Sequence, residues 1–476
     1  MLCLTLTGKN EKECLQQYHQ HKHYVQLIEL RMDLLHSPNK ETAQSIIKQL
    51  EMPVILTCRR PQDGGNWIHG ERSRCALLQS CLDIIPDFIE IEDDFKNSGL
   101  EKKAQELSVK IIRSCYYLEG LPDDLFAKIV KLKKRGDVAK IAVTPRNIKD
   151  VLKIFRVEKE LKDVPEKVIV GLGDWGIPTR ILYKRTGSLF TFCTFPGKSD
   201  ASGHLSPEIM YELYQSHKIT QSTKIFGIIG RPVMHTSSPM IHNPALKKIG
   251  LHAVYVPFLV DDVRTFFQLA ELLPVQGFSV TIPHKQHVLP YLGKISREVK
   301  LIGSCNTVVK KGGLWKGLNT DFYGFLKPIQ EKLEAGIIQK ALVIGAGGAA
   351  RAAVWALRNY RCKVVIINRT DEKAEKLAAE TGSEWGSLDD APAHRGADLI
   401  VQTTSAGMSP FEGVDPLPNY LFTGSELVYD LVYKPKVTAF LKRAEQAGCS
   451  IIYGMDMLLG QGVLQFESFT GMTFPS

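Results

Sequence analysis

A lysine interrupts an apolar run in the first half of the sequence. Residues 138–145 read VAKIAVTP, which without Lys140 would be an ordinary buried strand ended by Pro145. Burying an ammonium group without a partner is strongly unfavourable, so this position needs an explanation. A structural explanation is that Lys140 extends from a strand end toward water or pairs with Glu29. A functional explanation is that its amine takes part in chemistry.

A glycine-rich loop in the second half has the pattern of a dinucleotide-binding turn. GAGGAA (345–350) follows the predicted strand ALVI and opens a predicted helix, and the strand KVVIINRT comes next. Glycines at such a turn let the backbone approach a pyrophosphate, which the helix N-terminus attracts. A glycine turn for packing alone is the weaker alternative in this strand–turn–helix–strand context. The predicted cofactor-binding residues are Gly345, Ala346, Gly347, Gly348 and Ala349.

The end of the next strand discriminates between NAD and NADP. A protein specific for NAD places Asp or Glu there to bind the ribose 2′-hydroxyl. This chain has Asn368, Arg369 and Thr370, with Lys373 one turn later. Arginine can bind a phosphate through two hydrogen bonds and stack on adenine. We therefore predict NADPH as the cofactor.

Polar side chains follow several other predicted strands and turns of the second half. They occur in the stretches HTSSP, SVTIPHK, GSCNTV and GLNTDFYGF. Taken singly, each would be a turn or a helix cap in most proteins. The candidates are Thr236, Ser238, Thr281, Lys285, Asn306 and Asp321.

Length and composition limit the class of protein. A chain of 476 residues is too long for one ordinary core, and 44% hydrophobic with 23% charged residues is typical of a globular protein. The net charge of +9 is moderate and suits small anions better than nucleic acid. Ten scattered cysteines without a Cys-x-x-Cys pair suggest a reducing cytosol and no structural zinc site. No apolar run is long enough to span a bilayer and MLCLTLTGKN does not resemble a signal peptide, so we expect a cytoplasmic protein.

The first half contains eight short apolar runs, and helical patterns lie between most of them. They are 2–7, 24–33, 54–59, 88–92, 110–117, 140–145, 167–173 and 189–195. Eight strand–helix units in about 210 residues predict a (β/α)8 barrel, whose active site lies at the carboxyl ends of the strands. An open doubly wound sheet is the competing interpretation.

Composition divides the remaining chain. We expect the barrel over 1–215, a polar linker over 216–223, an α/β substrate domain over 224–325 and a Rossmann domain over 326–454. The last segment, 455–476, contains an amphipathic helix that we expect to fold back and complete the substrate domain.

Taken together and in this order, the motifs of the second half resemble those of shikimate dehydrogenase. The resemblance covers about 224–476 and includes HTSSP, SVTIPHK, CNT, NTD, GAGGAA, NRT, TTSAG, YDLVY and GMDMLLGQ. It implies that Lys285 and Asp321 are the catalytic pair and that Gly454 contacts the cofactor. It also implies a set of shikimate-binding residues, namely Thr236, Ser238, Thr281, Asn306, Tyr433 and Gln461.

The first half resembles type I 3-dehydroquinate dehydratase, which acts through a lysine imine. Lys140 in KIAVTP matches the imine-forming lysine, and an apolar environment would lower its pKa and favour the neutral nucleophile. The resemblance also implies substrate-binding roles for Glu29 and Arg31 in IELRMD, Arg59 in ILTCRR and Arg180 in GIPTRI.

The chain departs from that family at four positions. Tyr116 in SCYY aligns with the catalytic histidine, and Asp63 in RRPQDGG aligns with the glutamate that partners it. In SDASGHLS, Asp200 and His204 replace a serine and a glutamine. Tyr116 could carry a proton if its pKa were lowered, and His204 is the alternative acid/base. Losing a general acid/base costs about 10²–10⁴-fold in rate.

The resemblances imply a bifunctional enzyme of aromatic amino acid biosynthesis. Its first half would convert 3-dehydroquinate to 3-dehydroshikimate, and its second half would reduce that product to shikimate with NADPH. One alternative keeps only the dehydrogenase active, with the barrel as a scaffold or metabolite sensor. A second is a non-catalytic sensor, against which Lys285 and Asp321 argue.

Overall fold

The computed structural model of the chain describes residues 1–195, 205–234 and 236–475. It separates into two compact units, Met1–Val275 and Gln276–Ser476, and each is described by itself.

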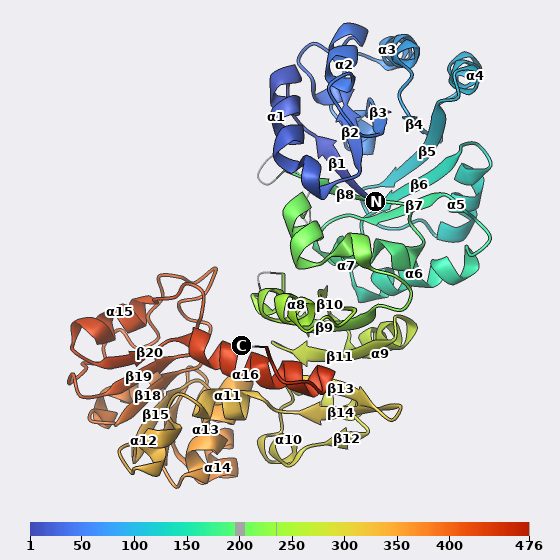
Figure 1. The fold of residues 1–476 in the computed structure, drawn as a ribbon. Helices are drawn as coiled ribbons and strands as arrows, with labels where there is room; N and C mark the ends of the chain where they lie inside the picture. Colours follow the sequence, from blue (N-terminus) through green and yellow to red (C-terminus); the bar gives the residue numbers. More distant parts are fainter. Residues whose placement is uncertain (196–204, 235, 476) are drawn as a thin grey trace. The chain divides into compact units, whose positions relative to one another are not determined.

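The first unit begins with a ring of eight parallel strands (Figure 1, blue to green). Their order is β7-β6-β5-β4-β3-β2-β1-β8, and a parallel bridge from Lys167 to Ser188 joins β7 to the segment before β8. This order confirms the barrel, because an open doubly wound sheet would not place β8 beside β1. The strands are β1 (Leu2–Leu6), β2 (Leu27–Arg31), β3 (Val54–Thr57), β4 (Phe88–Glu92), β5 (Lys110–Tyr117), β6 (Val138–Val143), β7 (Lys167–Gly171) and β8 (Thr191–Thr194).

Helices between the strands cover the barrel, and several begin at a side chain that caps them. Asn10, Asn39, Asn97, Asp124 and Asn147 each accept a hydrogen bond from a backbone N–H of the first turn. These caps fix where each helix begins. The helices are α1 (Glu11–His21), α2 (Lys40–Ile47), α3 (Glu71–Cys81), α4 (Ser98–Glu106), α5 (Leu125–Lys133), α6 (Ile148–Glu160) and α7 (Ile177–Ile181).

The rest of the first unit is a smaller α/β segment. It contains β9 (Lys224–Gly230), α8 (Ser238–Lys248), β10 (Ala253–Leu259) and α9 (Val263–Leu272). Strands β9 and β10 are parallel. Helix α9 packs on α6 of the barrel, and the backbone N–H of Ile148 donates to Asp261 (3.1 Å).

The second unit begins with a group of strands against which the last helix of the chain packs. Strand β13 pairs antiparallel with β11 and β14, and β14 pairs with β12. Helix α16 packs on α11 and β13. The elements are β11 (Val275–Val280), β12 (Lys294–Ile295), α10 (Arg297–Ile302), β13 (Thr307–Lys311), β14 (Leu314–Leu318), α11 (Asp321–Leu326) and α16 (Gly454–Thr470).

A parallel sheet of Rossmann type makes up the remainder, in the order β17-β16-β15-β18-β19-β20 (Figure 1, orange to red). Apolar side chains form a core on each face of this sheet. The strands are β15 (Lys340–Ile344), β16 (Lys363–Ile367), β17 (Glu384–Gly386), β18 (Leu399–Gln402), β19 (Leu427–Asp430) and β20 (Ser450–Ile452). The helices are α12 (Gln330–Glu334), α13 (Gly348–Asn359), α14 (Asp371–Thr381) and α15 (Ala439–Gln446).

Among the residues that the structure describes, no helix combines the length and apolar character that crossing a membrane requires.

Candidate active sites

Lys140 lies in the middle of β6 and is only 2% exposed. Its Nζ donates to Oε2 of Glu90 (2.7 Å), lies 3.7 Å from Oε1 of Glu29 and sits 4.2 Å from the ring centre of Phe192. The expectation of an apolar environment is therefore wrong, because two carboxylates surround the ammonium group. These ion pairs explain how a charged lysine is accommodated inside the barrel.

Glu29, the more distant of the two carboxylates from Lys140, accepts three hydrogen bonds. It accepts from Thr5 Oγ1 (2.7 Å) and Arg59 Nη2 (2.9 Å), with Thr57 Oγ1 at 3.4 Å. Burial by itself would raise the pKa of Glu29, but Lys140, Arg59 and Arg31 together lower it to about 2. Glu29 is therefore a fixed negative charge.

Glu90 is a site residue that the sequence analysis missed. Its Oε1 accepts a short hydrogen bond from the hydroxyl of Tyr116, while its Oε2 accepts from Lys140. Burial acts to raise the pKa of Glu90, but the nearby Lys140 and Arg59 lower it overall. A carboxylate inside the apolar run FIEIE was a signal of the same kind as Lys140 and could have identified it.

The sequence analysis allowed Tyr116 to carry a proton if its pKa were lowered, and the structure contradicts this condition. Burial raises the pKa of Tyr116 well above its usual value, and Glu90 adds to this effect although Arg59 opposes it. The guanidinium carbon of Arg59 lies 4.5 Å from the ring centre of Tyr116. Tyr116 is therefore a hydrogen-bond donor in this site and not an anionic base.

Asp63 makes a different contact from the one that its alignment suggested. It accepts from Nε of Arg60 (2.7 Å), which also pairs with Asp94. Among the described residues, the carboxylate that contacts Tyr116 is Glu90.

Two predicted arginines have different surroundings. Arg31 forms a two-bond ion pair with Asp33 (2.8 and 2.6 Å), whose carboxylate also accepts from the backbone N–H of Arg59. Arg180 is 1% exposed, and its Nε donates to the carbonyl of Gly171 (2.8 Å). Within the described part of the chain, both of its terminal nitrogens lack a partner. Burial lowers the pKa of Arg180 to about 10, so it remains a cation at neutral pH.

Asp200 and His204, which were also predicted for this site, lie outside the described residues.

In the second unit, Lys285 and Asp321 form the expected pair. Nζ of Lys285 donates to Oδ2 of Asp321 (2.5 Å), and the Lys285 side chain is 16% exposed. A Cβ added to Gly348 would lie 3.1 Å from Cδ of Lys285. The predicted catalytic lysine therefore lies against the predicted dinucleotide turn.

Asn306 holds the other oxygen of Asp321 in place. Its amide nitrogen donates to Oδ1 of Asp321 (2.9 Å) and to Oε1 of Gln461 (3.3 Å). Its amide oxygen accepts from the backbone N–H of Thr320 (2.8 Å) and from Thr307 Oγ1 (2.8 Å). The structure thus brings together three of the predicted side chains from separate elements.

Gln465 supports this network and was not predicted. Its amide nitrogen donates to the carbonyl of Asn306 (3.2 Å) and to Thr307 Oγ1 (3.1 Å), and its amide oxygen accepts from Ser279 Oγ (2.7 Å). Gln465 follows Gln461 by one helical turn on α16. This spacing was the available signal.

The glycine turn has the geometry that a dinucleotide requires. Gly345 has φ +110°, and a Cβ there would lie 2.5 Å from Oγ1 of Thr403. Around a Cβ added to Gly347, nothing lies within 4 Å, so the backbone is open to a ligand where α13 begins. Arg369, Thr370 and Lys373 are exposed where β16 meets α14. This donor set fits an NADP-type ligand.

The other predicted residues lie as follows. Thr236 and Ser238 belong to the first unit, at the start of α8, and their hydroxyls hydrogen-bond to each other (3.1 Å). Thr281 follows β11, and Tyr433 lies in the loop after β19. Ala346 and Ala349 flank the two central glycines, and Asn368 donates to the carbonyl of Thr370 (2.8 Å). Gly454 opens α16, where a Cβ would clash with the carbonyl of Val432.

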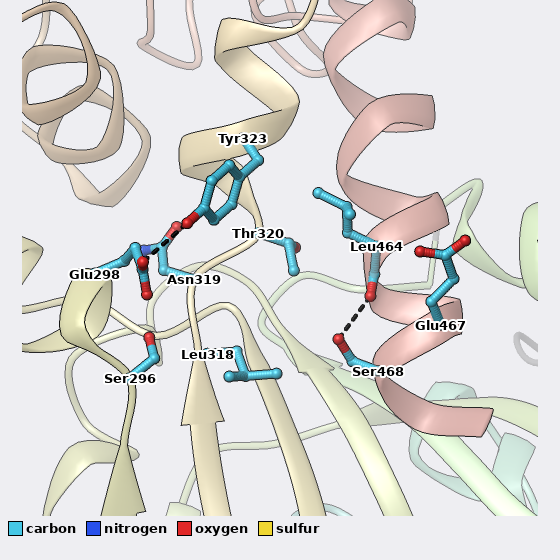
Figure 2. A pocket seen from close by; sticks show the side chains of 9 residues that line it. All are labelled: Ser296, Glu298, Leu318, Asn319, Thr320, Tyr323, Leu464, Glu467 and Ser468. Atoms are coloured by element: carbon cyan, nitrogen blue, oxygen red, sulfur yellow. Dashed lines mark hydrogen bonds between the residues drawn. The ribbon is translucent and has the colours of Figure 1, made fainter. Parts of the chain in front are cut away.

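A cavity of about 360 Å³ opens between α11 and α16, and Figure 2 shows the side chains around it. It contains Thr320, which bonds to Asn306, but neither Lys285 nor Asp321 lines it. The lining residues are Ser296, Glu298, Leu318, Asn319, Thr320, Tyr323, Leu464, Glu467 and Ser468. This cavity is therefore separate from the lysine–aspartate pair.

Known proteins resemble both parts of the chain. Residues 2–221 match the family model of type I 3-dehydroquinase, residues 228–308 that of the shikimate dehydrogenase substrate binding domain, and residues 329–411 that of shikimate/quinate 5-dehydrogenase. The bifunctional 3-dehydroquinate dehydratase/shikimate dehydrogenase of Arabidopsis thaliana, named as chloroplastic, is 33% identical over 96% of this chain and 79% of that protein.

Two further proteins match the second half. The shikimate dehydrogenase (NADP(+)) of Caldanaerobacter subterraneus subsp. tengcongensis is 38% identical over 54% of this chain and 95% of its own length. A crystal structure of shikimate dehydrogenase in complex with NADP+ is 36% identical, covers 54% of this chain and 92% of that chain, and has a TM-score of 0.50. With the barrel and the Rossmann-type sheet in one polypeptide, the chain belongs to the family of bifunctional 3-dehydroquinate dehydratase/shikimate dehydrogenases.

Proposed function

We propose that this chain catalyses two consecutive reactions, the dehydration of 3-dehydroquinate to 3-dehydroshikimate and the reduction of 3-dehydroshikimate to shikimate with NADPH. The observation that carries the proposal is that the lysine predicted to react in each unit lies against carboxylate. Lys140 lies between Glu90 and Glu29 inside the barrel, and Lys285 pairs with Asp321 beside Gly348.

In the barrel, Lys140 attacks the ketone of 3-dehydroquinate and forms an imine. The imine withdraws electrons from the adjacent carbon, so a proton there is removed and the β-hydroxyl leaves as water. The unpaired terminal nitrogens of Arg180 suit the substrate carboxylate, since a buried cation without a partner is unfavourable. The hydroxyls of the substrate are oriented by Glu29, Arg31 and Arg59, which also balance the charge of the site.

In the second unit, Lys285 donates a proton to the oxygen of the 3-dehydroshikimate ketone as this is reduced. Asp321 orients the ammonium group through its hydrogen bond, and Asn306 holds Asp321. The turn Gly345–Ala349 would hold the pyrophosphate of NADPH, and Arg369 with Lys373 its 2′-phosphate. Bound NADPH supplies a hydride to the carbonyl carbon.

The remaining assignments rest on the sequence pattern. The carboxylate and hydroxyls of shikimate are bound by Thr236, Ser238, Thr281, Tyr433 and Gln461. The substrate of the barrel is bound in part by Asp63, Asp200 and His204. The same proposal includes the four parts expected from the sequence, namely a barrel over 1–215, a linker over 216–223, a substrate domain over 224–325 completed by 455–476, and a Rossmann domain over 326–454. It also includes a cytoplasmic location.

Borohydride trapping tests the barrel half directly. Incubation with 3-dehydroshikimate and borohydride should add the mass of the reduced ligand to the peptide that contains Lys140, and the Lys140→Met variant should gain none. The same samples, assayed before borohydride, should oxidise NADPH when 3-dehydroshikimate is added. A wild-type chain that reduces 3-dehydroshikimate but traps no ligand would favour the alternative in which the barrel is a scaffold or sensor.

A further inference from the structure

Glu90 is hydrogen-bonded both to Lys140, the proposed nucleophile, and to Tyr116. Its side chain is 2% exposed, and its two oxygens accept from different donors, Lys140 Nζ at 2.7 Å and the hydroxyl of Tyr116. The tyrosine stands where the resembled family has a histidine. The carboxylate of Glu90 is therefore in direct contact with Nζ of Lys140, whereas the phenol of Tyr116 is linked to that nitrogen only by its hydrogen bond to Glu90.

The alternatives around Lys140 are less suited to accept a proton. The phenol of Tyr116 keeps its proton because burial raises its pKa. Glu29 lies 3.7 Å from Nζ of Lys140, and its oxygens already accept from Thr5 and Arg59. Glu90 is the nearer carboxylate, with the shorter and better-placed contact.

The charges change in favour of Glu90 during the reaction. In the resting site, Lys140 and Arg59 stabilise the anionic form of Glu90, whereas the neighbouring Glu29 opposes it. When Lys140 gives up its proton, one of the two stabilising charges disappears while Glu29 remains. A proton on Glu90 then becomes more favourable at the moment when it has to be held.

We propose that Glu90 is the general acid and base of the dehydration and that Tyr116 is a positioning residue that holds its carboxylate toward Lys140. This inference rests on the proposed function of the barrel and deepens it.

Every proton transfer in the proposed dehydration takes place among Glu90, Lys140 and the substrate. Glu90 takes a proton from the Lys140 ammonium, and the neutral amine adds to the ketone carbon. Protonated Glu90 gives this proton to the alkoxide oxygen, then takes a second proton from the nitrogen and passes it to the carbinol hydroxyl, which leaves as water and gives the iminium. Glu90 then removes a proton from the adjacent carbon, whose electron pair forms a C=C bond while the C=N π pair moves onto the nitrogen, which gives the enamine. The enamine expels the β-hydroxyl, Glu90 protonates it as water, and hydrolysis of the iminium releases the product.

The test compares the near-isosteric Glu90→Gln with Tyr116→Phe and with a matched control. Glu90→Gln should lower kcat for dehydration by about 10²–10⁴-fold, and the acid limb of its pH–rate profile should disappear. Tyr116→Phe should lower kcat less and keep that limb, with its pKa displaced. Glu90→Asp should recover part of the loss. The control, Glu106→Gln, removes an exposed carboxylate of α4 that pairs with Lys102 (3.8 Å), and should dehydrate normally.

Urea denaturation of each variant reports whether its barrel is folded, and reduction of 3-dehydroshikimate reports that the second unit is intact. The inference is overturned if Glu90→Gln dehydrates at the wild-type rate, or if Tyr116→Phe loses as much activity as Glu90→Gln together with the acid limb. An inactive wild-type barrel would instead overturn the proposed function, and this inference with it. An active wild-type barrel that tolerates Glu90→Gln overturns the inference alone.

Discussion

The two lysines of this chain are placed in opposite ways. Lys140 lies within a strand of a closed barrel, 2% exposed, with two carboxylates and an aromatic ring around its amine. Lys285 lies in the loop after β11, its side chain 16% exposed, with one carboxylate at 2.5 Å and a glycine turn beside it. Each arrangement suits a different task.

The difference is between a nucleophile and a proton donor. A lysine that forms an imine must lose its proton, bond to carbon and be released, so a second group has to hold the proton in place, and Glu90 is positioned for this. A lysine that only donates a proton needs one partner and a route to water for reprotonation. Partial exposure of Lys285 and its single carboxylate are sufficient for that.

The largest expected effect comes from removing the nucleophile. Lys140→Met should abolish dehydration, because no imine can form, and leave reduction of 3-dehydroshikimate unchanged. It also leaves Glu29 and Glu90 buried beside each other, which should cost about 3–5 kcal/mol in the free energy of unfolding of the barrel. Separate assays of the two reactions and urea denaturation measure both effects. Loss of both activities would mean that the two sites are not independent.

The matching change in the second unit is Asp321→Asn. Losing the carboxylate should reduce kcat for reduction by about 10²–10⁴-fold, since the amide neither orients Lys285 as an ion pair nor stabilises its charge. Dehydration of 3-dehydroquinate should continue at the wild-type rate, and urea denaturation of the variant is the folding control for the second unit. Wild-type reduction by this variant would contradict the role of the pair.

A smaller effect is expected from the cofactor site. Arg369→Gln should lower kcat/KM for NADPH by roughly 10- to 100-fold, because a charged hydrogen bond to phosphate is lost, and should not change kcat/KM for NADH, which lacks the 2′-phosphate. Lys376→Gln on the exposed side of α14 is the matched control and should match wild type. An equal loss with both cofactors would place Arg369 away from the 2′-phosphate.

The smallest effect is expected at Gln465, which supports Asn306 from behind. Gln465→Leu removes the hydrogen bonds of Gln465 to Ser279, Thr307 and the carbonyl of Asn306, and should reduce the free energy of unfolding of the second unit by about 1–3 kcal/mol. KM for 3-dehydroshikimate should rise a few-fold with dehydration unaffected. Ser468→Ala, one turn later on α16, should be neutral. If both variants unfold at the same urea concentration as wild type, the network does not depend on Gln465.

The sequence was sufficient for the elements and for most of the chemistry, because both are encoded locally. Eight apolar runs predicted eight barrel strands, and the spacing of Gly345, Gly347 and Gly348 predicted the turn between β15 and α13. Glu90 and Gln465 were missed because their roles arise from contacts between elements distant in sequence, and neither belongs to a short motif. The expected apolar environment of Lys140 was wrong for the same reason, since Glu29 and Glu90 come from β2 and β4.

The most direct test of the account is NADPH oxidation by the purified wild-type chain with 3-dehydroquinate as the only substrate. The account predicts steady oxidation after a lag, as the barrel supplies 3-dehydroshikimate to the second unit, and no oxidation with Lys140→Met. Oxidation with added 3-dehydroshikimate but none with 3-dehydroquinate would contradict it, and would leave the first unit without the dehydration assigned to it.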